Sequence, residues 1–84
     1  MEHRNLEGIK KSALQKVNLF LSEGAESYLT PDELASLLDL HPRTLANWRH
    51  YRKGPDFIKV GSRVRYPVSS VVEWLNEHKI LTRL

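Results

Sequence analysis

Basic side chains are concentrated in one part of this chain. Between His41 and Tyr66 the sequence carries seven lysine or arginine residues and one acidic residue, Asp56, whereas the rest of the chain has six basic and nine acidic residues. The seven cations are Arg43, Arg49, Arg52, Lys53, Lys59, Arg63 and Arg65. Ammonium and guanidinium groups pair with phosphate, and a guanidinium can also donate two hydrogen bonds to guanine. Their clustering favours a polyanionic partner over a merely solvated surface.

Several of these cations fall on or just after a predicted helix. Pro42 suits the first turn of a helix, and Gly54-Pro55 must end it, because a residue before proline resists helical backbone angles. Leu45 and Trp48 are three residues apart and predict the buried side. The outward side then carries Arg43, Thr44, Asn47 and His50.

These outward residues suit contacts with nucleic acid. Arg43 opposes the dipole at the start of the helix, which favours a contact with phosphate or guanine over a solvated role. Asn47 can pair with adenine, although an exposed asparagine is common without that role. Trp48 and Trp74 have helical spacing with leucines, which favours core packing over base stacking. Three later cations are expected partly to complement the negative end of the helix dipole and partly to bind phosphate: Arg49, Arg52 and Lys53.

A hairpin follows, and its turn admits two registers. A two-residue turn at Gly61-Ser62 sets Val60 opposite Arg63 and mixes charge into the apolar face. A three-residue loop over 61–63 pairs Val60 with Val64 instead, and we predict this register. It places on the core Ile58, Val60, Val64 and Tyr66, and it leaves outside Lys59 and Arg65.

The cations of the hairpin have two interpretations. A charged hairpin can simply protect a sheet edge from aggregation. Three cations without an acid among them exceed that need, so we favour contact with phosphate or with the minor groove. The candidates, with the serine of the turn, are Lys59, Ser62, Arg63 and Arg65.

Two further helices flank these elements. In Thr30-Pro31-Asp32-Glu33 the threonine can cap a helix, and Glu33 can complete a capping box. The buried side of that helix is supplied by Leu34, Ala35, Leu37 and Leu38. Asp39-Leu40-His41 then forms a turn. A last helix is predicted from about 68 to 78, with Val71, Trp74 and Leu75 facing inward.

Residues 5–23 predict an amphipathic helix, with Asn5 as its N-cap and Gly24 as its C-terminal stop. Its apolar stripe consists of Leu6, Ile9, Ala13, Val17, Phe20 and Leu21. The stripe packs either on the rest of the chain, on a second copy or on a recombinase. Residues 24–27 are predicted to be a short linker.

Composition excludes several classes of protein. The chain has 84 residues and no cysteine, so we expect one small domain without disulfides or a thiolate metal site. The four histidines lack metal-ligand spacing, and the serines have no evident catalytic partners, so we expect no metal, no cofactor and no enzymatic activity. No apolar run reaches the length of a membrane span, and the charged start does not resemble a signal peptide. We expect a soluble intracellular protein.

Four sequence blocks, taken in order, resemble the excisionase/AlpA-like, MerR-related winged helix-turn-helix family. They are Leu29–Leu38, Pro42–Trp48, Phe57–Tyr66 and Val71–Leu75, and the resemblance covers residues 29–78. It implies a small DNA-binding protein of phages and mobile elements, acting as a transcriptional regulator or bending DNA for a recombinase. It also implies a cytoplasmic, nucleoid-associated protein encoded by a prokaryote or phage. It also implies that the second helix of the motif enters the major groove while the hairpin follows the backbone or minor groove. On the family pattern, Arg43, Thr44 and Asn47 are helix contacts, and Lys59, Arg63 and Arg65 are hairpin contacts.

The chain departs from the family pattern in two places within the motif. His41 stands where a small capping residue is usual, so we expect either a weaker start to the helix or a cap made by the imidazole. Asp39-Leu40 replaces the usual Leu-Gly in the turn. Residues 1–27 lie outside the resemblance.

The expected fold is therefore mainly α with a small β-hairpin wing: a winged helix-turn-helix with an extra N-terminal amphipathic helix. The expected division is 1–27 for the N-terminal helix and linker, 28–80 for the DNA-binding domain and 81–84 for a tail. The expected partner is double-stranded DNA, with a recombinase or integrase, or further copies in a homodimer or cooperative array, as additional partners. The DNA-binding candidates are Arg43, Thr44, Asn47, Arg49, His50, Lys59, Ser62, Arg63 and Arg65.

Two alternative functions stay open at this stage. A phage terminase small subunit uses a similar DNA-recognition module, but there the module leads into a long oligomerising segment, and this chain ends soon after Trp74. A protein-interaction module that kept the fold but lost DNA binding is the other alternative. The basic hairpin counts against it.

Overall fold

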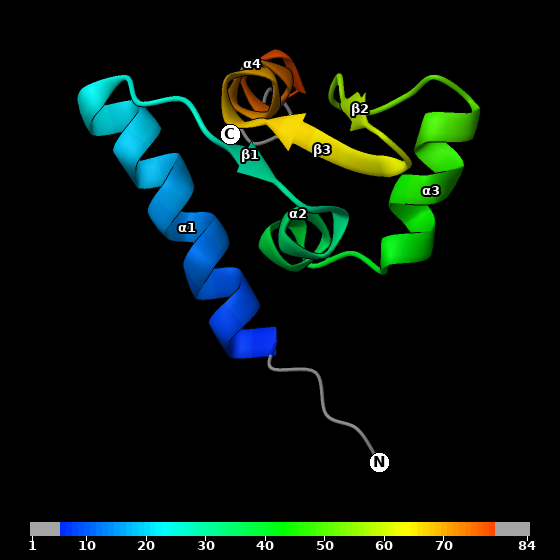
Figure 1. Cartoon of the computed structure of the whole chain (residues 1–84), viewed down its shortest axis with the longest axis horizontal. Helices are drawn as coiled ribbons and strands as arrows, with labels where there is room; N and C mark the ends of the chain where they lie inside the picture. Colours follow the sequence, from blue (N-terminus) through cyan, green and yellow to red (C-terminus); the bar gives the residue numbers. More distant parts are fainter. Residues whose placement is uncertain (1–5, 79–84) are drawn as a thin grey trace.

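The computed structural model describes residues 6–78. Within them the chain forms four helices and three strands (Figure 1). In chain order these are α1 (Leu6–Glu23), β1 (Tyr28–Leu29), α2 (Pro31–Leu38), α3 (Pro42–His50), β2 (Ile58–Val60), β3 (Arg63–Pro67) and α4 (Val68–His78). The strands make one antiparallel sheet in the order β1-β3-β2. The mainly helical fold with a β-hairpin wing and an additional N-terminal helix is confirmed.

The start of α2 has the predicted capping box. The Thr30 hydroxyl accepts a hydrogen bond from the Glu33 N–H at 3.0 Å, and the Glu33 carboxylate accepts one from the Thr30 N–H at 2.9 Å. At the other end, Asp39 adopts left-handed angles with φ +58°, and the Leu40 N–H bonds to the Ala35 carbonyl at 2.8 Å. An aspartate thus supports the chain reversal that glycine makes without strain.

The imidazole of His41 caps α3. Its Nδ1 accepts a hydrogen bond from the Arg43 N–H at 2.9 Å, and Pro42 occupies the first turn. This satisfies one of the N–H groups that the helix leaves without an internal partner. The departure from a small capping residue therefore changes the capping group and keeps the cap.

Removing this cap should destabilise the protein measurably. His41→Ala is expected to lower the free energy of unfolding by about 0.5–2 kcal/mol, the usual loss for a capping side chain. His41→Ser supplies another acceptor and should stay close to wild type. Urea denaturation of the three proteins at neutral pH measures the difference, and equal midpoints for His41→Ala and wild type would show that the cap contributes nothing.

A long-range contact, which sequence reasoning missed, caps α4. The Glu26 carboxylate accepts hydrogen bonds from the Ser69 N–H at 3.0 Å and from the Ser69 hydroxyl at 2.5 Å. The Ser69 hydroxyl, followed by backbone N–H groups, lowers the pKa of Glu26 below its ordinary value. The carbonyl of Ser27 accepts from the Val68 N–H at 2.9 Å. The segment after α1 is thereby tied to the start of α4, whose predicted bounds are confirmed.

The predicted register of the hairpin is wrong. Val60 pairs with Arg63 and Ile58 with Arg65, which is the two-residue turn at Gly61-Ser62. Gly61 supplies a positive φ of +69° at the first turn position, as a type II′ turn requires. Ile58 and Val60 are consequently 42% and 60% exposed.

Strand β1 explains why the core does not need those two side chains. Tyr66 of β3 pairs with Leu29 of β1 rather than with Ile58, and both residues of this pair are buried. A strand of two residues is too short to leave an alternating pattern, so no sequence signal predicted it.

The core is small and draws on most elements. Its buried hydrophobic residues are Ala13, Leu29, Leu34, Ala35, Leu45, Tyr66, Val68 and Val71. Helix α1 contributes Ala13, with Val17 and Phe20 packed beside it, so its stripe packs on its own chain. Leu21, predicted for this stripe, is 65% exposed. At about 100° per residue, Leu21 is about 80° around the helix from the buried Ala13, at the edge of the face that packs on the core. The predicted roles of Asn5 and of the Leu6 side chain lie outside the described residues.

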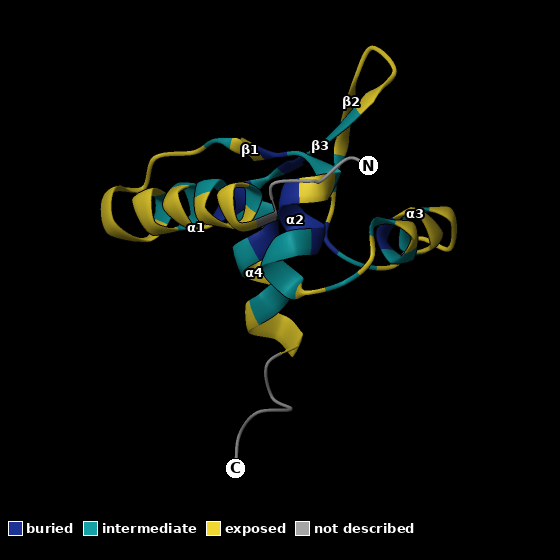
Figure 2. Ribbon diagram, turned by 90° about the horizontal axis from the view of Figure 1, so that it is seen from below, coloured by how far each residue is buried: buried dark blue, intermediate teal, exposed yellow. Residues whose placement is uncertain are grey.

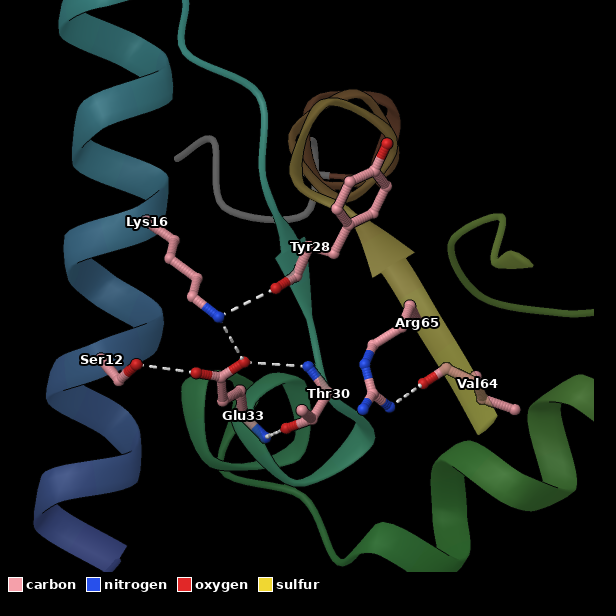
Figure 3. A network of polar contacts seen from close by, with 7 residues as sticks. All are labelled: Ser12, Lys16, Tyr28, Thr30, Glu33, Val64 and Arg65. Atoms are coloured by element: carbon pink, nitrogen blue, oxygen red, sulfur yellow. Dashed lines mark hydrogen bonds and ion pairs between the residues drawn. The ribbon is translucent and has the colours of Figure 1, made fainter. Parts of the chain in front are cut away.

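Polar contacts to Glu33 complete the docking of α1 (Figure 3). Glu33 is 8% exposed, and its carboxylate accepts from the Ser12 hydroxyl at 2.7 Å and the Lys16 ammonium at 3.0 Å, besides the Thr30 N–H. Lys16 also donates to the carbonyl of Tyr28 at 2.9 Å. Burial raises the pKa of Glu33, but the hydrogen bonds from Thr30, Ser12 and Lys16, with the charge of the ammonium, lower it overall. One carboxylate thus joins α1 to the start of α2.

Candidate nucleic-acid interface

The outer side of α3 is an exposed stripe. Arg43, Ala46, Asn47 and His50 recur at helical spacing and are all exposed, while Leu45 on the opposite side is fully buried. Thr44 is half-buried at the edge of this stripe. The outward positions of Arg43, Asn47 and His50 match the prediction. Sequence reasoning missed Ala46, although its spacing from Arg43 and His50 indicated the same face.

The β2–β3 hairpin, which we call the wing, stands out from the core (Figure 2). Lys59, Ser62 and Arg63 are exposed there, and Arg65 is half-buried with its guanidinium donating to the Val64 carbonyl at 2.7 Å. Because opposed residues share a face of the ribbon, Arg63 and Arg65 lie with the exposed Val60 and Ile58. Lys59 lies on the other face.

This arrangement corrects the predicted grouping of Lys59 with Arg65. Lys59 pairs with Val64, whose side chain packs against the core, and its own side chain is exposed at the edge strand. The two wing arginines therefore share a surface with two exposed aliphatic side chains, Ile58 and Val60. The predicted register missed this surface because it placed Ile58 and Val60 on the core.

Arg49 is directed toward the sheet. Its guanidinium donates a hydrogen bond to the Tyr66 hydroxyl at 2.7 Å and lies 5.8 Å from the centre of the Phe57 ring. Tyr66 is 1% exposed. The structure therefore does not bring Arg49 into the outer stripe of α3 with Arg43 and Asn47.

The two tryptophans pack against each other. The ring centres of Trp48 on α3 and Trp74 on α4 are 5.5 Å apart, and Trp48 also contacts the core. Gly54 lies beside the Trp48 ring, so that a Cβ at this glycine would be 2.7 Å from Trp48 Cε3. The tryptophans thus have the packing role that their spacing predicted.

Charges on α3 and the wing are available to a ligand. Within residues 6–78, none of the seven cations from Arg43 to Arg65 forms an ion pair with a carboxylate, and the pair that does form joins Lys16 to Glu33. Figures 1 and 2 show α3 and the wing on the side of the core away from α1. Unpaired cations gathered on one side of a small domain create a field that attracts a polyanion.

Comparison with known proteins gives the family. A family model described as a helix-turn-helix domain matches residues 28–79, which is more than half of the chain. The chain belongs to the helix-turn-helix domain family. Neither the curated proteins nor the solved structures include a significant match. The family covers excisionase/AlpA-like helix-turn-helix proteins, and membership supports sequence-specific binding of double-stranded DNA by this domain.

The helices also bear on membrane insertion. None within residues 6–78 combines the length and the apolar character needed to cross a bilayer.

Proposed function

We propose that this helix-turn-helix domain binds duplex DNA with α3 in the major groove and the wing along the adjacent backbone. The observation that carries the proposal is the position of the unpaired cations of α3 and the wing, on the side of the core away from α1. The major groove admits an α-helix, and the second helix of such motifs lies there with its N-terminal residues at the base edges.

The outer stripe of α3 supplies the contacts that read sequence. Arg43, in the first turn, donates to guanine O6 and N7 or to a phosphate, and Asn47, one turn later, pairs with adenine N6 and N7. The exposed methyl group of Ala46 between them suits contact with a thymine methyl. Thr44, at the edge of the stripe, and His50, at its C-terminal end, hydrogen-bond phosphate oxygens.

The wing supplies contacts that are insensitive to sequence. Arg63 and Lys59 are exposed and pair with phosphates, and Ser62 at the turn donates a hydrogen bond to the backbone. Arg65 shares the surface of Arg63, and the aliphatic Val60 beside them rests on sugar atoms. Arg52 and Lys53, exposed after α3, add phosphate contacts.

The biological role that these contacts suit is that of a small regulator or excisionase-type DNA-bending factor of a phage or mobile element. The resemblance of the chain to excisionase/AlpA-like proteins supports this role. A recombinase, or further copies of the domain on adjacent DNA, are the partners that such a role requires.

Two substitutions distinguish the contacts that recognise the base sequence from the contacts that bind the DNA backbone. Arg43→Ala is expected to weaken binding to the preferred duplex by about 1–3 kcal/mol and to relax the choice of one base pair. Arg63→Ala should weaken binding to all duplexes alike. The measurement is selection from a randomised duplex library, followed by titration of the selected and scrambled duplexes.

Lys11→Ala provides the matched control, because Lys11 is an exposed cation on α1, away from the wing and α3. It should bind both duplexes like wild type. If Arg43→Ala kept the affinity and the sequence choice of wild type, the proposed placement of α3 would be wrong.

A further inference from the structure

We infer that Arg49 is a positioning residue, which holds α3 at a fixed angle to the wing through the hydroxyl of Tyr66. This inference rests on the proposed function, because it concerns how the two DNA-contacting elements are held together. It assigns to Arg49 a role different from the phosphate contact that its charge first suggested.

Few side chains attach α3 to the rest of the domain. Leu45 is the buried residue of this helix, and Trp48 packs beside it on Trp74. Arg49 follows Leu45 by four residues and therefore points to the same side. Its bond to Tyr66 at 2.7 Å is thus part of a small set of contacts that determine where α3 lies.

The partner of Arg49 is itself held in place. Tyr66 is 1% exposed and pairs with Leu29 in the middle of the sheet, directly after Arg65 of the wing. No buried side-chain polar atom within residues 6–78 lacks a hydrogen-bond partner, and Arg49 supplies the bond to the Tyr66 hydroxyl. Loss of that bond would leave the buried Tyr66 hydroxyl without a partner. Because an unpaired buried polar group is costly, the bond from Arg49 is strongly favoured.

The guanidinium also reaches the other strand of the wing. It lies 5.8 Å from the ring centre of Phe57, the residue before β2, and this ring is 6.0 Å from that of Tyr66. A planar guanidinium holds such a geometry better than a flexible ammonium. Arg49 therefore contacts a side chain at the base of each wing strand, and the separation of α3 from the wing depends on it.

The test compares Arg49→Gln, Tyr66→Phe and the double variant of the full chain, each titrated with the duplex that wild type selects. Tyr66→Phe removes the acceptor but leaves the arginine. Each single variant should bind about tenfold more weakly, and the double variant should be no weaker than the singles within about twofold. The slope of log affinity against log salt should equal that of wild type, since no phosphate contact is lost.

A second readout follows the geometry without DNA. Because the chain has no cysteine, Ala46→Cys and Ser62→Cys introduce unique sites for spin labels on α3 and the wing. The distance distribution between the labels should broaden with Arg49→Gln and Tyr66→Phe, in samples whose circular dichroism shows them to be folded. Glu73→Gln, an exposed substitution on α4, is the control and should leave the distribution narrow. Arg49→Lys keeps a donor and should give an intermediate width.

Two results would overturn the inference. One is a salt slope that falls in magnitude by about 0.9 in Arg49→Gln, while Tyr66→Phe binds like wild type, because that pattern identifies a phosphate contact. The other is an unchanged distance distribution in both variants. If wild type bound no duplex, the proposed function would fail, and the distance measurement would still decide whether Arg49 positions α3.

Discussion

Gly54→Ala is expected to lower the free energy of unfolding by about 2–4 kcal/mol, combining left-handed strain with a clash. Gly54 has φ +83°, where a side chain is strained, and the new Cβ would be 2.7 Å from Trp48 Cε3. To relieve that contact, the Trp48 ring must shift from its position 5.5 Å from the Trp74 ring, which disturbs the packing of α3 on α4. Urea denaturation measures the loss of stability, and the affinity for duplex DNA should fall as well.

Gly24→Ala is the matched control for this substitution. Gly24 also has a positive φ, +71°, but a Cβ added there would meet no atom within 4 Å, so only strain of about 1 kcal/mol is expected. If the two alanine variants lost the same stability, the contact between Gly54 and the Trp48 ring would not restrain α3.

Glu33→Ala is expected to cost about 2–4 kcal/mol of stability, because hydrogen bonds to a charged acceptor are stronger than neutral ones. Its carboxylate accepts from Ser12, Lys16 and Thr30, which belong to α1 and to the segment before α2. Removing it leaves these donors without their acceptor and detaches α1 from α2. Denaturation at neutral pH measures the change, with Glu73→Ala as an exposed control that should lie within about 0.5 kcal/mol of wild type.

The carboxylate of Glu33 should also make the stability of the protein depend on pH. The pKa values of Glu33 and Glu26 are lower in the folded protein than their ordinary values, so the unfolded chain binds more protons as the pH falls. Their contribution is fully present above the ordinary glutamate pKa and is lost as the pH falls through the lowered values, from about pH 5 downward. Glu33→Gln should lose less stability than wild type over that interval. A parallel loss in both proteins would contradict the role given to this group.

Local signals predicted the helices because their causes are local. The Thr30–Glu33 box and Pro42 marked where α2 and α3 begin, and the spacing of Leu45 and Trp48 showed which side of α3 faces outward. These features depend on hydrogen bonds and packing within a few residues, so they can be predicted from the sequence alone.

The features that sequence reasoning missed depend on distant partners. The register of the wing was wrong because Ile58 and Val60 were assigned to the core, whereas Tyr66 obtains its strand partner from Leu29, far away in the chain. The cap of α4 by Glu26 spans 43 residues in the same way. Arg49 is different, because its position four residues after Leu45 already indicated the inward side of α3. It was nevertheless assigned to the helix dipole or to phosphate because of its positive charge.

The proposed function depends most on one contact, the neutralisation of duplex phosphates by cations of α3 and the wing. Its most direct test is the affinity of the wild-type protein for duplex DNA, measured at a series of salt concentrations. If about five cations pair with phosphates, log affinity should fall with log salt with a slope of about −4 to −5. A slope near zero would show that the cationic surface does not bind the phosphate backbone, and it would contradict the account.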